Sequence, residues 1–230
     1  MSESRQGRDI RIGAGTRALD AYIALPAAQH GAGILVIQEW WGLVPHIRDV
    51  CDRLAREGFV ALAPDLYRGE RASDPDAASR LMMHLDIARA GEDLATAVTH
   101  LRNHAAVDGA RVGCIGFCMG GQLALAAGCA NPAIGALVDC YGIHPEVHPD
   151  WSALRAPVLG IFAENDEFVP PQAARKLESD LREAGARAHI KIYVGVQHAF
   201  MNDARPEVYD APAAAEAWND LLAFFRAELR

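Results

Sequence analysis

Short apolar segments alternate with segments of helical pattern along almost the whole chain, and this order constrains the fold more than any other feature. The segments 33–38 (GILVIQ), 59–63 (FVALA) and 111–117 have the length and composition of strands that are buried on both faces. Helical patterns follow at 45–56 and 119–129. Because strands separated by helices need right-handed crossover connections, we predict an α/β fold with a mainly parallel sheet and helices on both faces.

The remainder of the chain continues this alternation. Strands are expected at 8–13, 18–25, 134–141, 157–162 and 189–194, and helices at 171–184 and 211–229. A long helical pattern from Asp76 to His104 is expected to break near Gly91, because glycine weakens a helix interior. No linker, repeat or composition shift divides the chain, so residues 1–230 are expected to form one domain without a separate lid domain.

The charge and the apolar pattern exclude some classes of function. The chain has 22 basic and 30 acidic residues, a formal charge of −8, and no basic cluster, which argues against nucleic-acid binding. No apolar segment reaches the roughly 20 residues of a membrane span. The polar start of the chain does not resemble a secretory signal, and a cytoplasmic protein is therefore expected.

The five cysteines are not spaced as metal ligands or as a redox pair. Cys51, Cys114, Cys129 and Cys140 are expected to be reduced thiols. Cys118 differs from them in its context.

Cys118 lies in the segment 116–121 (GFCMGG), between an expected strand and an expected helix. A sharp strand-to-helix turn leaves little room beside its central residue, which explains the flanking glycines. Such a turn exposes the central side chain above the carboxyl edge of the sheet, at a helix N-terminus that favours a thiolate. The alternative is a purely structural role, in which a tight glycine turn contains a packed cysteine. The strand before it and the helix after it favour a nucleophile.

An acid and a histidine follow the nucleophile in the order typical of this kind of turn. Asp166 follows the strand 157–162, and His198 follows the strand 189–194, so all three side chains are expected at the same sheet edge. Asp166 could instead cap a helix, which would leave Glu164 as the acid. His144 also follows a strand and is the best rival to His198.

The loop 38–42 (QEWWG) follows the first apolar strand and is expected to donate one backbone amide to an oxyanion hole. We assign the two donors to Trp40 and Met119. From the residues alone, Glu39 is interpreted as a loop cap.

With these motifs, the chain resembles the dienelactone hydrolases (carboxymethylenebutenolidases), which have the α/β-hydrolase fold. The similarity rests on the loop 38–42, the segments 63–69 (APDLYRG) and 116–121, Tyr141-Gly142, Asp166 before Val169-Pro170, and His198-Ala199-Phe200. The resemblance implies a Cys-His-Asp triad at Cys118, His198 and Asp166, a thioester intermediate, and no cofactor. It also implies that Glu39 helps to activate the thiol when substrate binds.

The sequence departs from the family where the substrate carboxylate is held. The dienelactone-cleaving members use two arginines, and this chain has Asn202 at one position and, in our register, Pro75 at the other. An uncharged side chain does not replace a bidentate arginine. Arg71, Arg80 and Arg205 lie nearby in the sequence.

We therefore expect a hydrolase that acts on a small-molecule ester or lactone, as a monomer or small homo-oligomer. Trp41, Tyr141, Phe200 and Asn202, together with Trp40, are expected near the substrate, although each aromatic has a core interpretation too. One alternative is a broad carboxylesterase or thioesterase with a different natural substrate. The other is a hydrolase-fold protein that binds a small molecule without catalysis.

Overall fold

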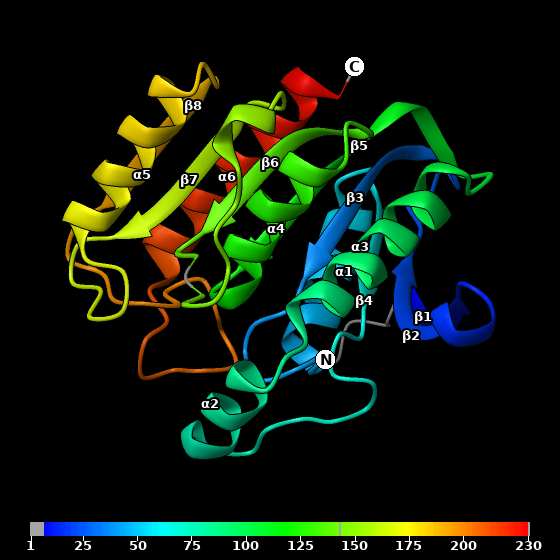
Figure 1. The fold of residues 1–230 in the computed structure, drawn as a ribbon, viewed down its shortest axis with the longest axis horizontal. Helices are drawn as coiled ribbons and strands as arrows, with labels where there is room; N and C mark the ends of the chain where they lie inside the picture. The colour runs from blue at the N-terminus through cyan, green and yellow to red at the C-terminus, as the bar shows by residue number, and fades with distance from the viewer. Residues whose placement is uncertain (1–6, 143, 230) are drawn as a thin grey trace.

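One eight-stranded sheet organises the computed structural model, which describes residues 7–142 and 144–229 (Figure 1). The strands are β1 (Gly7–Ile12), β2 (Leu19–Ala24), β3 (Gly31–Ile37), β4 (Val60–Pro64), β5 (Val107–Phe117), β6 (Ile134–Cys140), β7 (Val158–Ala163) and β8 (Ala188–Tyr193). Their spatial order is β1-β2-β4-β3-β5-β6-β7-β8. The strands from β4 to β8 pair in parallel, and β2 pairs antiparallel with both β1 and β4. The predicted mainly parallel sheet is confirmed.

Helices cover both faces of the sheet, as predicted. They are α1 (Pro45–Arg56), α2 (Pro75–Met83), α3 (Ile87–Arg102), α4 (Met119–Ala130), α5 (Pro171–Glu183) and α6 (Ala211–Glu228). Apolar side chains of α1 and α6 join one core cluster, and those of α3 and α4 join a second cluster on the other face. Parallel strands buried on both faces explain why β3 and β4 read as continuous apolar runs.

The helical pattern between residues 76 and 104 breaks at a different place from the one predicted. The break is at residues 84–86, between α2 and α3, and Gly91 lies inside α3. Asp86 caps α3 by accepting a hydrogen bond from the Arg89 amide at 3.0 Å. The prediction at Gly91 was therefore wrong, because this cap begins a new helix earlier and α3 accommodates the glycine.

The carboxyl ends of five neighbouring parallel strands meet at one edge of the sheet. The predicted site residues follow the ends of β3, β5, β6, β7 and β8. Open α/β sheets bind ligands at this edge. No helix in the described part of the chain is both long and apolar enough to cross a bilayer.

Candidate active site

Cys118 occupies a strained turn between β5 and α4. Its backbone has φ 54° and ψ −125°, a region that residues with a side chain rarely adopt. The neighbouring glycines are sterically required, since a Cβ on Gly116 would lie 1.8 Å from the Gly120 carbonyl oxygen. A Cβ on Gly120 would lie 2.5 Å from the carbonyl oxygen of Gln38. The turn thereby holds the thiol at the N-terminus of α4, where the helix dipole favours negative charge.

His198 and Asp166 form a hydrogen-bonded pair at the same edge. The Nδ1 atom of His198 lies 2.8 Å from Oδ2 of Asp166. The other carboxylate oxygen accepts hydrogen bonds from the amides of Phe168 and Val169, both at 2.8 Å. With its oxygens occupied in this way, Asp166 is fixed, and it in turn orients the imidazole.

The imidazole of His198 is confined and electrostatically coupled to the thiol. Burial disfavours its charged form, but its interactions with Asp166 and Cys118 outweigh burial and raise the pKa of His198 to about 10. The rings of Tyr141 and Phe168 contact the imidazole, each with a centroid distance of 5.0 Å. The arrangement suits a group that exchanges a proton with the Cys118 thiol.

The alternative acid and the rival histidine have other partners. Glu164 is exposed, and its carboxylate accepts a hydrogen bond from the Gly195 amide at 2.8 Å. Nδ1 of His144 accepts the Glu146 amide at 3.2 Å, and burial lowers the pKa of His144. Among these candidates, Asp166 and His198 are the two that the fold brings together.

The two amides predicted for an oxyanion hole are positioned by the ends of β3 and β5. Among residues 7–142 and 144–229, the backbone amides of Trp40 and Met119 donate no hydrogen bond to the protein. Met119 is the first residue of α4, where helix geometry leaves the amide without an acceptor in the helix. Both amides are therefore available to an acceptor from outside the chain.

Glu39 is buried and shares a hydrogen bond with Asn202. The carboxylate is 1% exposed, and its Oε2 accepts from Nδ2 of Asn202 at 2.8 Å. Its Oε1 is buried without a hydrogen-bond partner in the described structure. Glu39 therefore does not act as a loop cap, which corrects that interpretation. No sequence spacing could have revealed a contact between residues 163 positions apart.

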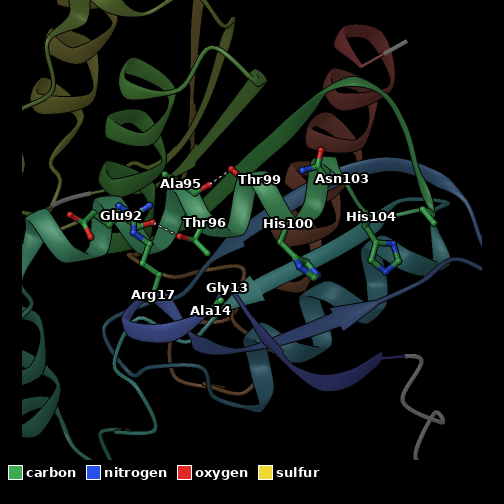
Figure 2. Close-up of a pocket in the computed structure, with 11 residues that line it drawn as sticks. Gly13, Ala14, Arg17, Glu92, Ala95, Thr96, Thr99, His100, Asn103 and His104 are labelled. Carbon is green, nitrogen blue, oxygen red and sulfur yellow. Dashed lines mark hydrogen bonds between the residues drawn. The ribbon is translucent and has the colours of Figure 1, made fainter.

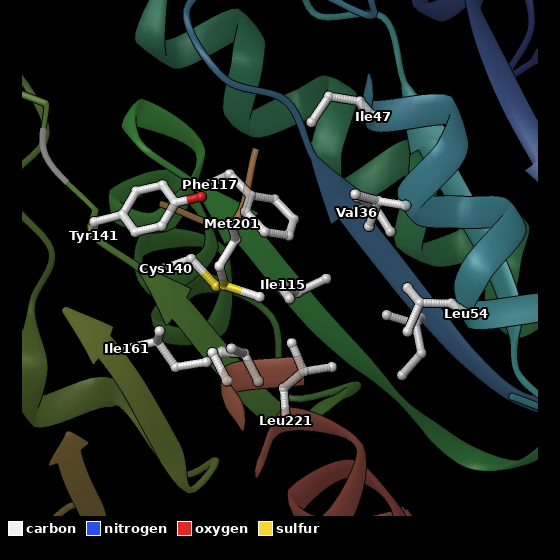
Figure 3. Packing of buried hydrophobic residues seen from close by; sticks show 14 of the residues in the cluster. Val36, Ile47, Leu54, Ile115, Phe117, Cys140, Tyr141, Ile161, Met201 and Leu221 are labelled. Atoms are coloured by element: carbon white, nitrogen blue, oxygen red, sulfur yellow. The ribbon is translucent and has the colours of Figure 1, made fainter. Parts of the chain in front are cut away.

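Tyr141 and Phe200, predicted as pocket residues, are both fully buried. Tyr141 follows β6 with φ 44°, and its hydroxyl group has no hydrogen-bond partner in the described structure. Burial and the charge of Glu39 raise the pKa of Tyr141 well above its usual value. Figure 3 shows the Tyr141 ring beside Phe117, with Cys140 and Met201 below them. Tyr141 thus packs against His198, and Phe200 packs behind Tyr141 with 5.9 Å between the ring centroids.

Two of the three arginines near the positions of the family's substrate-binding arginines, Arg71 and Arg205, have partners within the protein. Arg71 donates to the carbonyl oxygens of Leu43 and Gly69 at 2.9 and 3.0 Å. Pro75 is exposed as the first residue of α2. Arg80 is also exposed on α2.

Arg205 lies over the Trp41 ring, with 5.5 Å between its Cζ and the ring centroid, and pairs with Glu207 at 2.8 Å. Asn202 stands at the position of one of the two arginines that bind the substrate carboxylate in the family. It is 2% exposed and donates a hydrogen bond to Glu39.

An aromatic rim of Trp40, Trp41 and Phe168 borders His198, and the sequence analysis missed Phe168. Trp40 contacts both Trp41 and Phe168, with centroid distances of 5.3 and 6.1 Å. Phe168 is 55% exposed although it contacts His198. Its place two residues after Asp166, on the same short loop, is the signal that could have identified it.

A groove of ≈ 950 Å³ lies at a different place, between α3 and the β1–β2 connection (Figure 2). It is lined by polar side chains that include Thr96, Thr99, His100 and His104, and none of the triad residues lines it. Within the described ranges, no three His, Cys, Asp or Glu side chains gather as a metal site.

Comparison with known proteins identifies the family and agrees with the fold. The model of the dienelactone hydrolase family matches residues 19–229. Protein usf of Aquifex pyrophilus is 39% identical over 212 residues, covering 89% of this chain and 91% of that protein. An Aquifex aeolicus protein named "Putative carboxymethylenebutenolidase" is 35% identical over 216 residues, covering 91% of this chain and 93% of that protein.

A solved structure agrees as well. The structure titled "Putative Dienelactone Hydrolase" from Klebsiella pneumoniae superposes with a TM-score of 0.86 at 30% identity, covering 96% of this chain and 98% of that one. The chain therefore belongs to the dienelactone hydrolase family and is a hydrolase of the α/β-hydrolase fold.

Proposed function

We propose that this hydrolase cleaves small, uncharged esters or lactones through a cysteine nucleophile. The observation that carries the proposal is the pairing of His198 with Asp166 at 2.8 Å, at the sheet edge where Cys118 occupies its strained turn. A nucleophile, a base and a group that orients the base are the parts needed for covalent acyl transfer.

In the proposed mechanism, the Cys118 thiolate attacks the carbonyl carbon of the ester, and the amides of Trp40 and Met119 stabilise the oxyanion. The C–O bond to the alcohol breaks, and imidazolium His198 protonates the departing oxygen, which leaves a thioester on Cys118. Neutral His198 then takes a proton from water, and the hydroxide attacks the thioester. The Cys118 sulfur leaves as the thiolate, His198 is again imidazolium, and the acid is released. In a lactone, the alcohol and the acid remain in one product.

The charges around the triad favour an uncharged substrate. Glu39 is a buried carboxylate beside the site, and Asn202 is neutral. Arg205 is already paired with Glu207. An anionic substrate would meet the Glu39 carboxylate, whereas the aromatic rim of Trp40, Trp41 and Phe168 suits an apolar group.

The first experiment compares wild type with Cys118→Ala on p-nitrophenyl acetate, p-nitrophenyl butyrate and a carboxylate-bearing dienelactone. Cys129→Ala is the matched control, because Cys129 is also a free cysteine, half-buried on α4. We expect hydrolysis of the neutral esters by wild type and the control, and none above background by Cys118→Ala. Equal activity of Cys118→Ala would remove Cys118 as the nucleophile. Absence of any turnover by wild type, combined with binding of an ester, would favour the non-catalytic alternative.

A second experiment tests the aromatic rim. Phe168→Ala should lower kcat/KM for p-nitrophenyl butyrate about tenfold, because it removes an apolar contact worth roughly 1–2 kcal/mol, and should change it less for the acetate. Val194→Ala is the control, since Val194 is 79% exposed and follows β8. Equal losses for both esters would show that Phe168 acts through His198 and not on the substrate.

The broad carboxylesterase or thioesterase alternative uses the same triad. Dominant activity on acyl thioesters in the same panel would favour it over a preference for lactones.

A further inference from the structure

A carboxyl group that the proposed mechanism does not use lies directly beneath the nucleophile turn. Asp139 is on β6, is 0% exposed, and is paired in register with Gly116 of β5 and Gly160 of β7. The next residue, Cys140, accepts a hydrogen bond from the Cys118 amide at 3.0 Å. Asp139 is therefore one residue from the strand position that anchors the nucleophile.

The carboxyl group faces the first turn of α4. A Cβ on Gly121 would lie 2.0 Å from Oδ1 of Asp139, and a Cβ on Gly142 would lie 2.1 Å from the same atom. The oxygen thus occupies the space that a side chain at either glycine would fill. The Gly121 amide also donates to the Cys118 carbonyl oxygen at 2.9 Å, so the carboxyl group touches the turn that holds the thiol.

Among the described residues, no positively charged side chain is paired with this carboxyl group. No side chain in the described ranges bonds to either oxygen. The first turn of α4 carries no acidic residue and α4 ends without a basic one, and the register neighbours on β5 and β7 are glycines. On its own strand the titratable neighbour is Cys140, whose thiol also senses Glu39. Burial raises the pKa of Asp139 to about 7, and only the Gly142 amide opposes this.

We propose that the protonation state of Asp139 controls the electrostatic potential at Cys118. Protonated Asp139 leaves the positive end of α4 free to stabilise the thiolate, and ionised Asp139 opposes it. Asp139 acts through the helix and does not contact substrate, so it is a positioning residue. The inference rests on the proposed function only in taking Cys118 as the nucleophile.

The coupling has a measurable consequence. Negative charges on Asp139 and on the Cys118 thiolate disfavour each other, and the coupling free energy is the same whichever group ionises first. If Asp139 ionises first, the Cys118 thiol needs a higher pH to ionise. If the thiolate forms first, Asp139 needs a higher pH. The midpoint pH of one of the two titrations must therefore shift when the other group is replaced by a neutral one.

The test follows both titrations in the intact protein, without any turnover. Thiolate formation is measured by ultraviolet absorbance as the difference between proteins with Cys118 and with Cys118→Ala, in wild-type and Asp139→Asn backgrounds. Titration of Asp139 is followed by carbon NMR of aspartate-labelled wild type and Cys118→Ala. Asp139→Ser serves as a second neutral variant if the amide disturbs folding.

We expect one titration to shift downward by about one pH unit, a tenfold change in an ionisation constant. Shifts below about 0.3 units in both titrations would overturn the proposal and leave Asp139 a structural residue. Failure of the proposed function is a separate result, because it would appear as ester hydrolysis by Cys118→Ala, whatever the titrations show.

Discussion

The two sides of Cys118 differ in how completely their polar atoms are bonded. On the side of β7 and β8, Asp166 bonds to His198 and to two backbone amides. On the side of β3 and β6, buried oxygens of Glu39 and Tyr141 have no hydrogen-bond partner in the described structure, and the Asp139 carboxyl group interacts there with the Gly142 amide alone. Asp166 is 4% exposed, and Glu39, Asp139 and Tyr141 are 0–1% exposed, so the burial of these groups does not explain the difference.

The hydrogen-bonded side and the side with unpaired buried oxygens differ in what they contribute to the site. Buried polar groups normally have partners, because an unpaired group costs roughly 1–3 kcal/mol. The bonded side fixes the geometry of the imidazole before substrate arrives. The unbonded side keeps charge and hydrogen-bonding capacity close to the thiol, which is consistent with groups whose state changes during a reaction cycle.

The largest loss of activity is expected when the hydrogen-bonded side loses the Asp166 carboxylate, which accepts the hydrogen bond from His198. Asp166→Asn should lower kcat/KM for p-nitrophenyl acetate by about 10³–10⁴-fold, because the amide no longer holds His198 in the required tautomer. The fold should be retained, since the Asn oxygen can still accept the Phe168 amide. Steady-state kinetics and circular dichroism provide the measurements. Glu164→Gln, on the same loop but exposed, is the control, and a similar loss there would contradict the assignment.

On the side with unpaired oxygens, Asp139 should make the free energy of unfolding depend on pH. The pKa of Asp139 is about 7 in the folded state and about 3.9 in an unfolded chain, so the folded protein holds an extra proton between these values. The free energy of unfolding should therefore fall as pH rises from about 4 to 7, by up to about 4 kcal/mol from this group. Urea denaturation across this range, with wild type and Asp139→Asn, measures the effect. Parallel curves for the two proteins would refute it.

A smaller effect is expected at Glu39. Glu39→Gln keeps the shape and can still accept the Asn202 amide, but it removes the negative charge beside the thiol. We expect kcat/KM to fall about 100-fold, the magnitude typical of lost proton-transfer assistance, with unchanged thermal stability. Full activity of Glu39→Gln would show that the carboxylate is a structural acceptor only.

The smallest effect is expected at Tyr141. Tyr141→Phe removes a buried hydroxyl group that has no hydrogen-bond partner among the described residues, and it keeps the ring against His198. Stability should stay equal or rise by about 1 kcal/mol, and kcat/KM should change less than about threefold. Thermal denaturation and ester kinetics test this together. A large loss of activity with stability intact would mean that the hydroxyl group takes part in the reaction.

The order of strands and helices, and the shared sheet edge of Cys118, Asp166 and His198, could be predicted because both follow from local pattern. Apolar runs of strand length determine where the parallel strands end, and the motif residues follow those ends. The start of β5 was less predictable. It begins at Val107, not at Arg111, because its first residues pair with Gly31 and Ala32 of β3 before an irregularity.

Contacts between distant loops were beyond prediction from pattern. The resemblance identified Asn202 as a departure, yet nothing in its neighbourhood shows that its amide binds Glu39. Asp139 lies within an apolar strand, and it is not part of any motif recognised in the sequence. Its position under α4 depends on the packing of Gly121 and Gly142, which only the folded chain reveals.

The two rings around His198 also limit how the imidazole can move. Tyr141 and Phe168 each contact it at 5.0 Å, and Asp166 holds one of its nitrogens. A ring confined in this way has little freedom to rotate about its Cβ–Cγ bond, so its two nitrogens keep their places from one turnover to the next. In the role proposed for His198, the orientational entropy of the imidazole is thereby lost once, during folding, and not again in each catalytic cycle.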